Sequence, residues 1–379
     1  MNYITLKDVC NINMGQSPDS KSYNEFQDGI PFFQGNADFG ERYPITRIWC
    51  NSPTKIAEKD DILISVRAPI GALNYAKETC CIGRGLAAIT PDKTKVSTEF
   101  IFWLLKGKNQ ELNQLGTGST FKAISKKVLE NTRIPETPLE KQIECSNILE
   151  KIYSIITHRK QQLEKLDLLV KARFVEMFGD VATSDYKYST KKLGDVANVG
   201  SSHRVFTKEF VETGVPFYRG TEIGELANGI QPKEPFYISE EHYKKIADDE
   251  TRPKKGDLLM PSICNKGQVW RVDTDKPFYY KDGRVLCISA DREIYNTIFL
   301  QFFMREKTII EYPKIGSGST FAEFKIFLLK DIDVLTPPID LQTQFADFVQ
   351  QVDKSKAVLQ RELEKAQMLF DSLMQEYFG

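Results

Sequence analysis

The sequence lacks the features that mark most enzymes and membrane proteins. Its 379 residues include only three histidines, His158, His203 and His242, and no Cys/His spacing matches a zinc site. No glycine–lysine–serine/threonine phosphate loop and no Asn-Pro-Pro-Tyr-like motif occurs. No apolar run approaches the roughly 20 residues that a membrane span needs. We therefore expect no catalytic residue, no metal and no membrane partner, and we expect the histidines to be structural or surface residues.

An excess of basic charge is missing as well. The chain has 51 Lys+Arg against 52 Asp+Glu, a net charge of −1, whereas proteins that bind nucleic acid alone usually carry a basic excess. If DNA is the ligand, a partner has to supply part of the phosphate-neutralising charge. The seven cysteines are scattered, and the adjacent Cys80 and Cys81 suit neither a disulfide framework nor a metal site, which predicts a cytoplasmic location.

What the chain does have is an internal repeat. The segment Leu115–Phe121, Leu-Gly-Thr-Gly-Ser-Thr-Phe, returns 200 residues later as Ile315–Phe321, and the same offset relates Gln142 to Gln342. Farther upstream the similar segments lie 185 to 196 residues apart, so the first part of each repeat carries loops of variable length. Variable loops on a rigid scaffold are common sites of binding specificity, and a duplicated unit suggests a two-fold target such as duplex DNA.

The part of each repeat that has a fixed length predicts a long helix. Pro138 and Pro338 stand where a helix would start. No proline occurs between Pro138 and Gly179, or between Pro338 and the end of the chain. Apolar residues recur every three or four positions in both segments, Ile152 and Ile155 among them. We expect the two helices to pack on each other, antiparallel, as a coiled-coil spacer with the globular parts at opposite ends. The alternative is that each helix packs on its own globular part or on a partner protein.

The segments before these helices predict a mixed α/β structure. Short buried strands are expected at 62–66, 83–89, 258–260 and 283–288, and hydrophobic helices at 99–105 and 298–304. The predicted fold class is therefore α/β (α+β) with internal pseudo-two-fold symmetry. We expect a first globular domain over residues 1–137, a spacer helix over 138–180, a second globular domain over 185–337 and a second spacer helix over 338–379.

The order of these pieces resembles the specificity subunit of type I restriction–modification systems. The matching features are Pro31-Phe32-Phe33 and Pro216-Phe217-Tyr218, Asp61-Ile62-Leu63 and Asp257-Leu258-Leu259, the two Gly-Ser-Thr-Phe segments, and the segments Pro135–Gln142 and Leu335–Gln342. Each feature is short, but together they occur in order, are duplicated and cover essentially the whole chain.

The resemblance implies a function for each part. The two globular domains would be target-recognition domains, each binding one half of an asymmetric bipartite site on double-stranded DNA, and the helices would fix the gap between the halves. The expected partners are two copies of a methylating subunit, which binds S-adenosylmethionine and methylates adenine, and translocating, cleaving restriction subunits that the complex can recruit. The chain itself would be a non-catalytic subunit without a cofactor.

The candidate DNA-binding residues are polar and basic residues of the variable loops and of the glycine-rich repeats. Arginine and lysine suit guanine, and asparagine and glutamine suit adenine. The predicted residues are Gln34, Asn36, Arg67, Thr117, Ser119, Thr120 and Lys122 in the first half, and Arg219, Thr221, Asn265, Lys266, Arg271, Ser317, Ser319 and Thr320 in the second. The alternative for the glycine-rich repeats is a purely structural or subunit-docking turn. In either case we expect Phe121 and Phe321 in the core.

Three other functions stay open on sequence grounds. They are a free-standing DNA-binding protein, a restriction nuclease with fused recognition domains, and a coiled-coil scaffold that does not bind DNA. A nuclease needs clustered carboxylates, for which Asp60, Asp61 and Asp257 are the candidates. An aspartate directly before a buried strand is, however, more often a turn residue.

Overall fold

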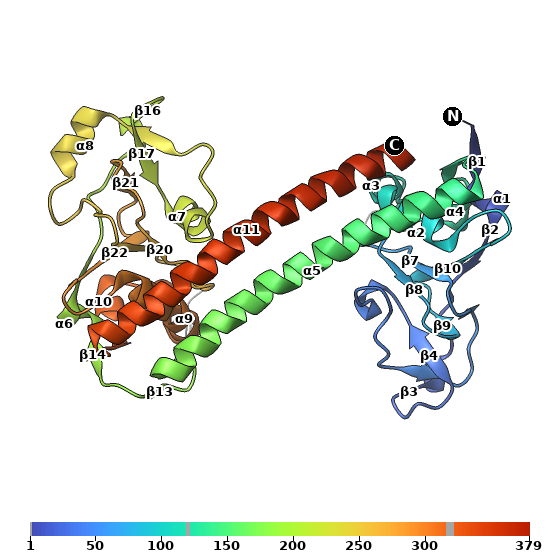
Figure 1. Cartoon of the computed structure of the whole chain (residues 1–379), viewed down its shortest axis with the longest axis horizontal. Coiled ribbons are helices and arrows are strands. Elements are labelled where there is room, and N and C mark those ends of the chain that lie inside the picture. Colours follow the sequence, from blue (N-terminus) through green and yellow to red (C-terminus); the bar gives the residue numbers. More distant parts are fainter. Residues whose placement is uncertain (1, 119–121, 316–321) are drawn as a thin grey trace. The chain divides into compact units, whose positions relative to one another are not determined.

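A computed structural model gives the structure of the chain and describes residues 2–118, 122–315 and 322–379 (Figure 1). The chain divides into two compact units, of which unit 1 comprises Met1–Gln161 and Leu359–Gly379, and unit 2 comprises Gln162–Val358. Each unit contains one globular part and one half of each long helix. Among the residues that the structure describes, none of the helices is both long and apolar enough to cross a membrane.

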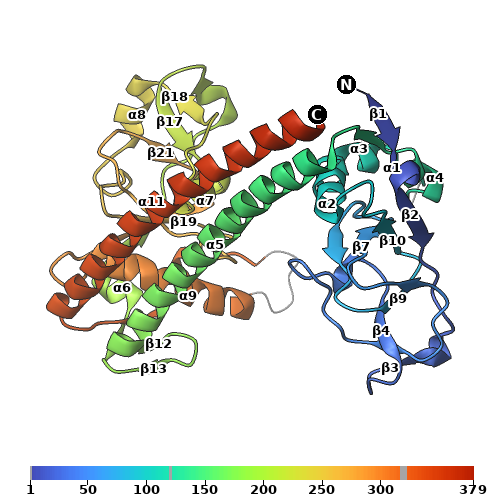
Figure 2. The ribbon, with the colours of Figure 1, turned by 45° about the vertical axis from the view of Figure 1, so that its right-hand side comes forward.

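Unit 1 is built on two sheets, a four-stranded antiparallel sheet with the order β2-β10-β7-β8 and a five-stranded sheet with the order β3-β5-β4-β9-β6, both visible in Figure 2. Within the second sheet, β4 and β9 are parallel. The elements are β1 (Tyr3–Thr5), α1 (Leu6–Val9), β2 (Cys10–Met14), η1 (Ser20–Ser22), β3 (Tyr23–Asn24), β4 (Ile30–Phe33), η2 (Asn36–Asp38), β5 (Trp49–Cys50), β6 (Ile56–Ala57), β7 (Ile62–Ser65), β8 (Leu73–Tyr75), β9 (Cys80–Ile82), β10 (Leu86–Pro91), α2 (Thr98–Gly107), α3 (Asn109–Gln114), α4 (Lys126–Glu130) and β11 (Arg133–Pro135), which pairs with β1.

Unit 2 repeats this plan. Its antiparallel sheet β15-β22-β19-β20 corresponds to β2-β10-β7-β8, and its parallel pair β17–β21 corresponds to β4–β9. The elements are β12 (Gly179–Asp180), β13 (Asp185–Tyr186), β14 (Thr190–Lys192), α6 (Leu193–Val196), β15 (Ala197–Gly200), η3 (Thr207–Glu209), β16 (Phe210–Val211), β17 (Val215–Tyr218), α7 (Gly220–Ala227), β18 (Phe236–Ile238), α8 (Glu240–Ile246), β19 (Leu258–Pro261), β20 (Trp270–Arg271), β21 (Tyr279–Tyr280), β22 (Val285–Ala290), α9 (Thr297–Ile315), α10 (Ile326–Lys330) and β23 (Asp333–Leu335). The duplicated α/β architecture that the repeat predicts is confirmed.

The two long helices are α5 (Leu139–Phe178) and α11 (Ile339–Phe378). The first ends as predicted at Gly179, whose φ of +97° favours glycine. In unit 1, Arg159 pairs with Glu362 at 2.7 Å, and the rings of Tyr153 and Phe370 lie 6.1 Å apart. Within this unit a later residue of α5 therefore contacts an earlier residue of α11, so the two half-helices are antiparallel.

The same direction holds within unit 2. Lys356 pairs with Asp167 at 2.5 Å, and the rings of Phe174 and Phe345 lie 5.3 Å apart. The predicted antiparallel packing is thus present in each unit. The alternative, in which each helix packs on a globular part, also holds, because each core includes residues from both a helical pair and a sheet.

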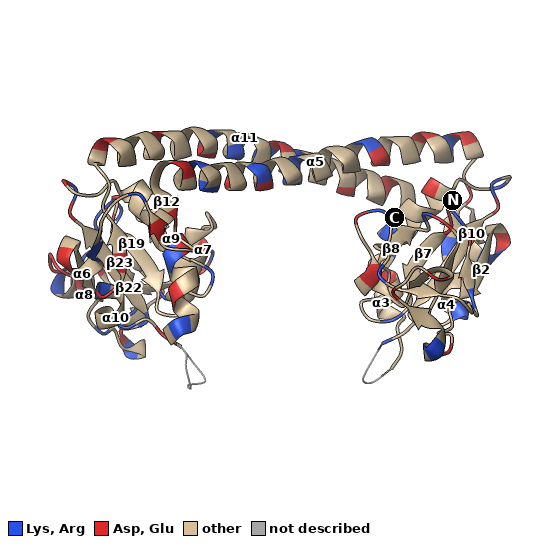
Figure 3. Ribbon diagram, turned by 90° about the horizontal axis from the view of Figure 1, so that it is seen from below, with Lys and Arg blue, Asp and Glu red and all other residues tan. Residues whose placement is uncertain are grey.

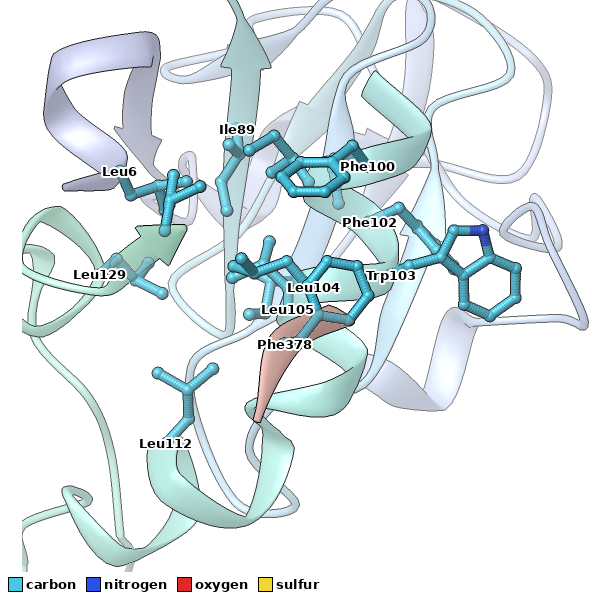
Figure 4. Packing of buried hydrophobic residues seen from close by; sticks show 14 of the residues in the cluster. Leu6, Ile89, Phe100, Phe102, Trp103, Leu104, Leu105, Leu112, Leu129 and Phe378 are labelled. Carbon is cyan, nitrogen blue, oxygen red and sulfur yellow. The ribbon is translucent and has the colours of Figure 1, made fainter. Parts of the chain in front are cut away.

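The core of unit 1 shows this joint packing (Figure 4). Trp103 and Phe100 of α2 are almost fully buried, and Phe378, near the end of α11, lies 5.2 Å from the Phe100 ring. The predicted series of buried apolar residues on α5 is wrong at one position, since Ile155 is 48% exposed whereas its neighbour Ile156 is 2% exposed. This half of α5 packs on both α2 and α11, and the buried face follows that double contact rather than a single narrow seam.

Three further sequence predictions are wrong in their limits. The strands expected at 83–89 and 283–288 begin only at Leu86 and Val285. The glycines before them form turns, in which the Leu86 N–H donates to the Gly83 carbonyl at 3.0 Å and Gly283 has a φ of +61°. The helix expected at 298–304 continues as α9 to Ile315.

Candidate nucleic-acid interface

The first candidate residues lie where strand β4 of unit 1 ends. Its last residues, Phe32 and Phe33, are buried against the neighbouring strands. The next residue, Gln34, is exposed, and its backbone N–H donates to the Asp38 carboxylate at 2.8 Å. Asn36 lies between them in the short turn η2 and is half-buried. The buried strand and the carboxylate together hold the two amide side chains at the edge of the sheet.

Arg67 approaches the same place from the four-stranded sheet. The residue before it, Val66, donates its N–H to the Gly85 carbonyl and accepts the Ile124 N–H, both at 2.9 Å. Arg67 itself is exposed. A Cβ at Gly85 would lie 2.3 Å from the carbonyl oxygen of Gln34. Glycine at this position therefore permits the close approach that brings Gln34 near the end of β7.

Gln34, Asn36 and Arg67 line one hollow of about 350 Å³. The Asp38 carboxylate, also at this hollow, accepts the N–H groups of Gln34 and of Gly35 at 2.8 and 3.4 Å. The hollow thus presents two amide groups and one guanidinium. These groups form paired hydrogen bonds with adenine and guanine respectively, so the arrangement suits the edge of a base pair.

The described residues on either side of the glycine-rich repeat of unit 1 pair with each other and with the chain after Arg67. Thr117 and Ala123 exchange backbone hydrogen bonds at 3.0 and 2.9 Å, and the Lys122 carbonyl accepts the Ala68 N–H at 3.1 Å. Thr117 and Lys122 are both exposed, and Lys122 adds a cation to the turn whose backbone pairs with Arg67 and Ala68. The predicted contacts Ser119 and Thr120, and the predicted core residue Phe121, lie outside the described residues.

In unit 2 the position that corresponds to Gln34 is held more firmly. Arg219 follows β17, and its guanidinium pairs with Glu222 at 2.5 Å while lying 4.6 Å from the centre of the Phe236 ring. Burial opposes ionisation of Glu222, but the hydrogen bonds from Arg219 outweigh it and lower the pKa of that carboxyl. Thr221 is exposed in the first turn of α7. Arg219 is thus a rigid, oriented cation at the start of a helix.

The other candidates in unit 2 do not gather around Arg219. Asn265 and Lys266 are exposed in a turn between β19 and β20. Arg271 lines a separate hollow of about 330 Å³ with Arg292 and Asn296. Three predicted contacts, Ser317, Ser319 and Thr320, and the predicted core residue Phe321, are not among the residues that the structure describes. The predicted site is therefore compact in unit 1 and spread over several surfaces in unit 2.

Sequence reasoning missed the carboxylates that shape both turns. Asp38 binds the N–H of Gly35, three residues before it, and Glu222 binds the N–H of Arg219 at the same spacing. The signal was present, because an acidic residue three positions after the start of a helical turn is a common capping pattern.

The aspartates that suggested a nuclease act as turn residues. The Asp61 carboxylate accepts the Glu58 N–H at 2.8 Å, and the Asp257 carboxylate accepts the N–H of Lys254 at 2.8 Å. Asp257 also pairs with Arg292 at 3.0 Å. The structural alternative is confirmed for Asp61 and Asp257, since each carboxylate holds a backbone amide of its own turn.

Charge on the two units is mixed. Lys and Arg alternate with Asp and Glu along the elements of each unit (Figure 3). In unit 2, Glu323 pairs with both Arg284 and Lys325. Non-specific attraction to phosphate is expected to be modest, in line with the net charge of −1.

Comparison with known proteins connects this geometry to a family. A family model described as the type I restriction modification DNA specificity domain matches residues 1–167 and again residues 183–367. The putative type I restriction enzyme MjaX specificity subunit of Methanocaldococcus jannaschii is 45% identical over 156 residues, which are 41% of this chain and 37% of that protein. The type I restriction enzyme MjaIX specificity subunit of the same organism is 22% identical over 97% of this chain and 90% of its own length. The crystal structure of a type I restriction–modification S subunit from M. genitalium covers 100% of this chain and 96% of its own, with 16% identity and a TM-score of 0.59, so the fold is shared.

Proposed function

This chain belongs to the type I restriction–modification DNA specificity family, and from that premise we propose that it selects the DNA sequence on which a methylating enzyme acts. Residues 1–137 and 185–337 are the two recognition domains in this proposal, and each binds one half of a bipartite site. The observation that carries it is the hollow where Gln34, Asn36 and Arg67 come together from two sheets.

The two half-sites differ in this proposal because the two units present different side chains. Unit 1 offers two amides and a guanidinium, whereas unit 2 offers Arg219 and Thr221 at the matching strand end. The first set suits adenine and guanine together, and a single oriented arginine suits guanine. An asymmetric, bipartite duplex site follows from unlike domains on a duplicated scaffold.

Catalysis belongs to the partners in this proposal. Adenine methylation would be carried out by a methylating subunit with S-adenosylmethionine, and cleavage by restriction subunits. The binding of Asp61 and Asp257 to turn amides supports a chain that recognises rather than reacts.

Two apolar pairs on the long helices support the docking of two methylating subunits. Leu168 and Leu169 are 65% and 48% exposed, and Met368 and Leu369, 200 residues later, are 64% and 51% exposed. One pair lies in each unit. Duplicated apolar pairs without intramolecular cover are expected to bind two copies of the same partner.

Replacing Leu168 and Leu169 with glutamate is expected to weaken the binding of one methylating subunit by at least about tenfold, because about 1.4 kcal/mol of apolar burial is lost. The copy at Met368 and Leu369 should still bind. Mass measurement of the assembled complex checks this as a change from two copies to one. Lys165→Glu, on the same exposed stretch of α5, is the matched control, because it lowers the net charge by the same amount. Two retained copies in the leucine variant would contradict the docking sites.

The long helices are also proposed to set the gap between the half-sites. Insertion of seven residues into each helix, at the boundary between Gln161 and Gln162 and between Val358 and Leu359, adds about 10 Å of helix and keeps their register. The preferred gap should lengthen by roughly three base pairs at 3.4 Å each. Binding to duplexes with graded gaps measures the shift. The same insertion at the exposed loop residue Gly229 should leave the gap unchanged, and an unchanged gap in both variants would refute the spacer role.

Methylome sequencing of cells that carry this chain with its methylating subunit tests the function as a whole. A motif of a few bases, a fixed gap and a few more bases, lost when this chain is deleted, is the expected result. An unchanged methylome would refute the proposal. The purified chain alone then separates the alternatives, since a nuclease would cut DNA with a metal ion and a free-standing binder would saturate DNA without a partner.

A further inference from the structure

One arginine of the variable loop in unit 1 is enclosed by aromatic rings. Arg42 lies between η2 and β5, and only 24% of its side chain is exposed. The guanidinium carbon lies 4.9 Å from the ring centre of Phe102, 5.2 Å from Tyr75, 5.5 Å from Trp103 and 5.9 Å from Tyr153. The Arg42 cage consists of this guanidinium and the four rings, which come from β8, α2 and α5.

The cage is completed by a carboxylate on the long helix. Arg42 forms an ion pair with Glu150 of α5. The other terminal nitrogen, Nη1, is buried and has no hydrogen-bond partner within the described part of the chain. A guanidinium that has lost its water needs a paired charge and polarisable neighbours, and Glu150 and the ring faces provide both. The loop is therefore held to α5 by a charge that is costly to release.

A second cation shares this carboxylate. The ammonium of Lys106 lies 3.9 Å from the Tyr153 ring centre and 5.2 Å from that of Trp103. Burial, and then the nearby Arg42 charge, lower the pKa of Lys106 to about 8, while Glu150 opposes the shift. Because two cations face one carboxylate, loss of Glu150 would leave Arg42 and Lys106 repelling each other.

Hydrogen bonds connect Arg42 to the residues that line the hollow. The Arg42 carbonyl accepts the Tyr75 N–H at 2.8 Å, and the buried Asn74 exchanges two hydrogen bonds of 3.1 Å with Gly40. The Asp38 carbonyl accepts the Ile45 N–H at 2.8 Å.

The last link reaches the recognition turn itself. The Asp38 carboxylate binds the Gln34 N–H, so the loop from Gln34 to Ile45 is one hydrogen-bonded piece. The Arg42 side chain attaches that piece to α5.

Unit 2 fills the corresponding place differently. Tyr75 lies opposite Ile62, and Arg271, 196 residues later, lies opposite Leu258. The counterpart of Tyr153 at the 200-residue offset is Asp353. Burial raises the pKa of Asp353, whereas Lys356, Arg305 and Arg271 act against that rise. In unit 2 the cation thus comes from strand β20. Within the described residues of unit 2, no such ion pair attaches the turn after β17 to a long helix.

We propose that Arg42 is a positioning residue for DNA recognition, which fixes the loop carrying Gln34 and Asn36 to α5 and thereby sharpens the base preference of the first half-site only. This inference rests on the proposed function. It adds a physical connection between base recognition in unit 1 and the helix on which the partner is proposed to dock. Arg42 acts through the loop and needs no contact with DNA.

Four variants of the full chain, co-purified with its methylating subunit, test this proposal. Arg42→Met keeps the length of the side chain and removes its charge, Arg42→Lys keeps the charge without the planar fork, and Glu150→Gln removes the paired carboxylate. The matched control is Arg133→Met, which removes an exposed guanidinium stacked 4.3 Å from the Tyr3 ring centre in the same unit. Each complex methylates a library of randomised duplexes, and sequencing gives the base preference at every position of both half-sites.

Arg42→Met is expected to lower discrimination in the first half-site about tenfold, as couplings carried by packed side chains do, and to leave the second half-site unchanged. Glu150→Gln and Arg42→Lys should fall between wild type and Arg42→Met, and Arg133→Met should match wild type. Hydrogen exchange of the Gln34 and Ile45 amides, measured without DNA, should speed up in Arg42→Met and not in Arg133→Met.

Several outcomes would overturn the proposal. If Arg42→Met leaves the base preference of the first half-site unchanged, or lowers the base preference equally in both half-sites, a positioning role confined to unit 1 is refuted. Unchanged exchange of the Gln34 amide would refute the attachment itself. A wild-type complex that shows no half-site preference would remove the proposed function, and the exchange result would then still report whether Arg42 holds the loop.

Discussion

Replacing Phe174 with alanine is expected to destabilise unit 2 by about 3–5 kcal/mol, the usual cost of truncating a fully enclosed phenylalanine. The side chain is 1% exposed, and its ring centre lies 4.9 to 6.4 Å from five other aromatic rings. Those rings belong to α5, α9 and α11. The resulting cavity would loosen the joint between both long helices and the core of unit 2.

Hydrogen exchange resolved by segment is the suitable measurement, because a chain of two units need not unfold in one step. Amides of β19, β22 and α9 should lose protection, while those of β7 and β10 in unit 1 should keep it. Val175→Ala, one residue along α5 at a side chain that is 38% exposed, should change stability by less than about 1 kcal/mol. Equal effects of the two variants would show that the aromatic cluster does not hold unit 2 together.

The repeat made the architecture predictable where periodicity and spacing carry information. The helix expected over 138–180 is α5, Leu139–Phe178, because proline marks its start and glycine its end. The buried glutamines are a second case. Gln142 accepts the Ser97 N–H and Gln342 accepts the Asn296 N–H, both at 3.0 Å, so the identity at the 200-residue offset reflects the same joint in both units.

Packing direction on the long helices was less predictable. A repeat of three and four residues is compatible with Ile155 or Ile156 facing inward, and packing in the shared core of unit 1 selects Ile156. A tertiary contact of this kind leaves no periodic signal, because it adds one more packed element to a face that already has a partner.

The candidate site was predictable in residue type more than in place. Gln34, Asn36 and Arg67 gather at one hollow because buried strands end there. Arg271, chosen by the same chemical criterion, lies at the strand position of Tyr75 and is directed to other basic and acidic groups of unit 2. Arg42 was missed because its role depends on four rings that are distant in sequence.

Arg67→Ala is expected to lower the affinity for a duplex that contains the recognised bipartite site about ten- to a hundredfold. It should also relax the base preference at one position of the first half-site. A bidentate arginine–guanine contact accounts for roughly 1–3 kcal/mol of discrimination, and each 1.4 kcal/mol corresponds to a factor of ten. Arg67→Lys should not restore the preference, since an ammonium lacks the two parallel donors of a guanidinium. Titration against duplexes that carry each of the four bases at every position measures both effects.

Lys122→Ala is the matched comparison, because Lys122 is exposed and its carbonyl accepts the N–H of Ala68, the residue after Arg67. A lysine that contacts phosphate should, when removed, weaken binding to all sequences alike and reduce the dependence of log affinity on log salt by about one. Arg67→Ala should instead change the ranking of sequences. If the two variants lose affinity in the same uniform way, Arg67 contacts the backbone of the DNA and the bases of the first half-site are read by Gln34 and Asn36 alone. If Arg67→Ala changes neither affinity nor ranking, the hollow in unit 1 is not the DNA interface, and recognition has to be sought elsewhere on that unit.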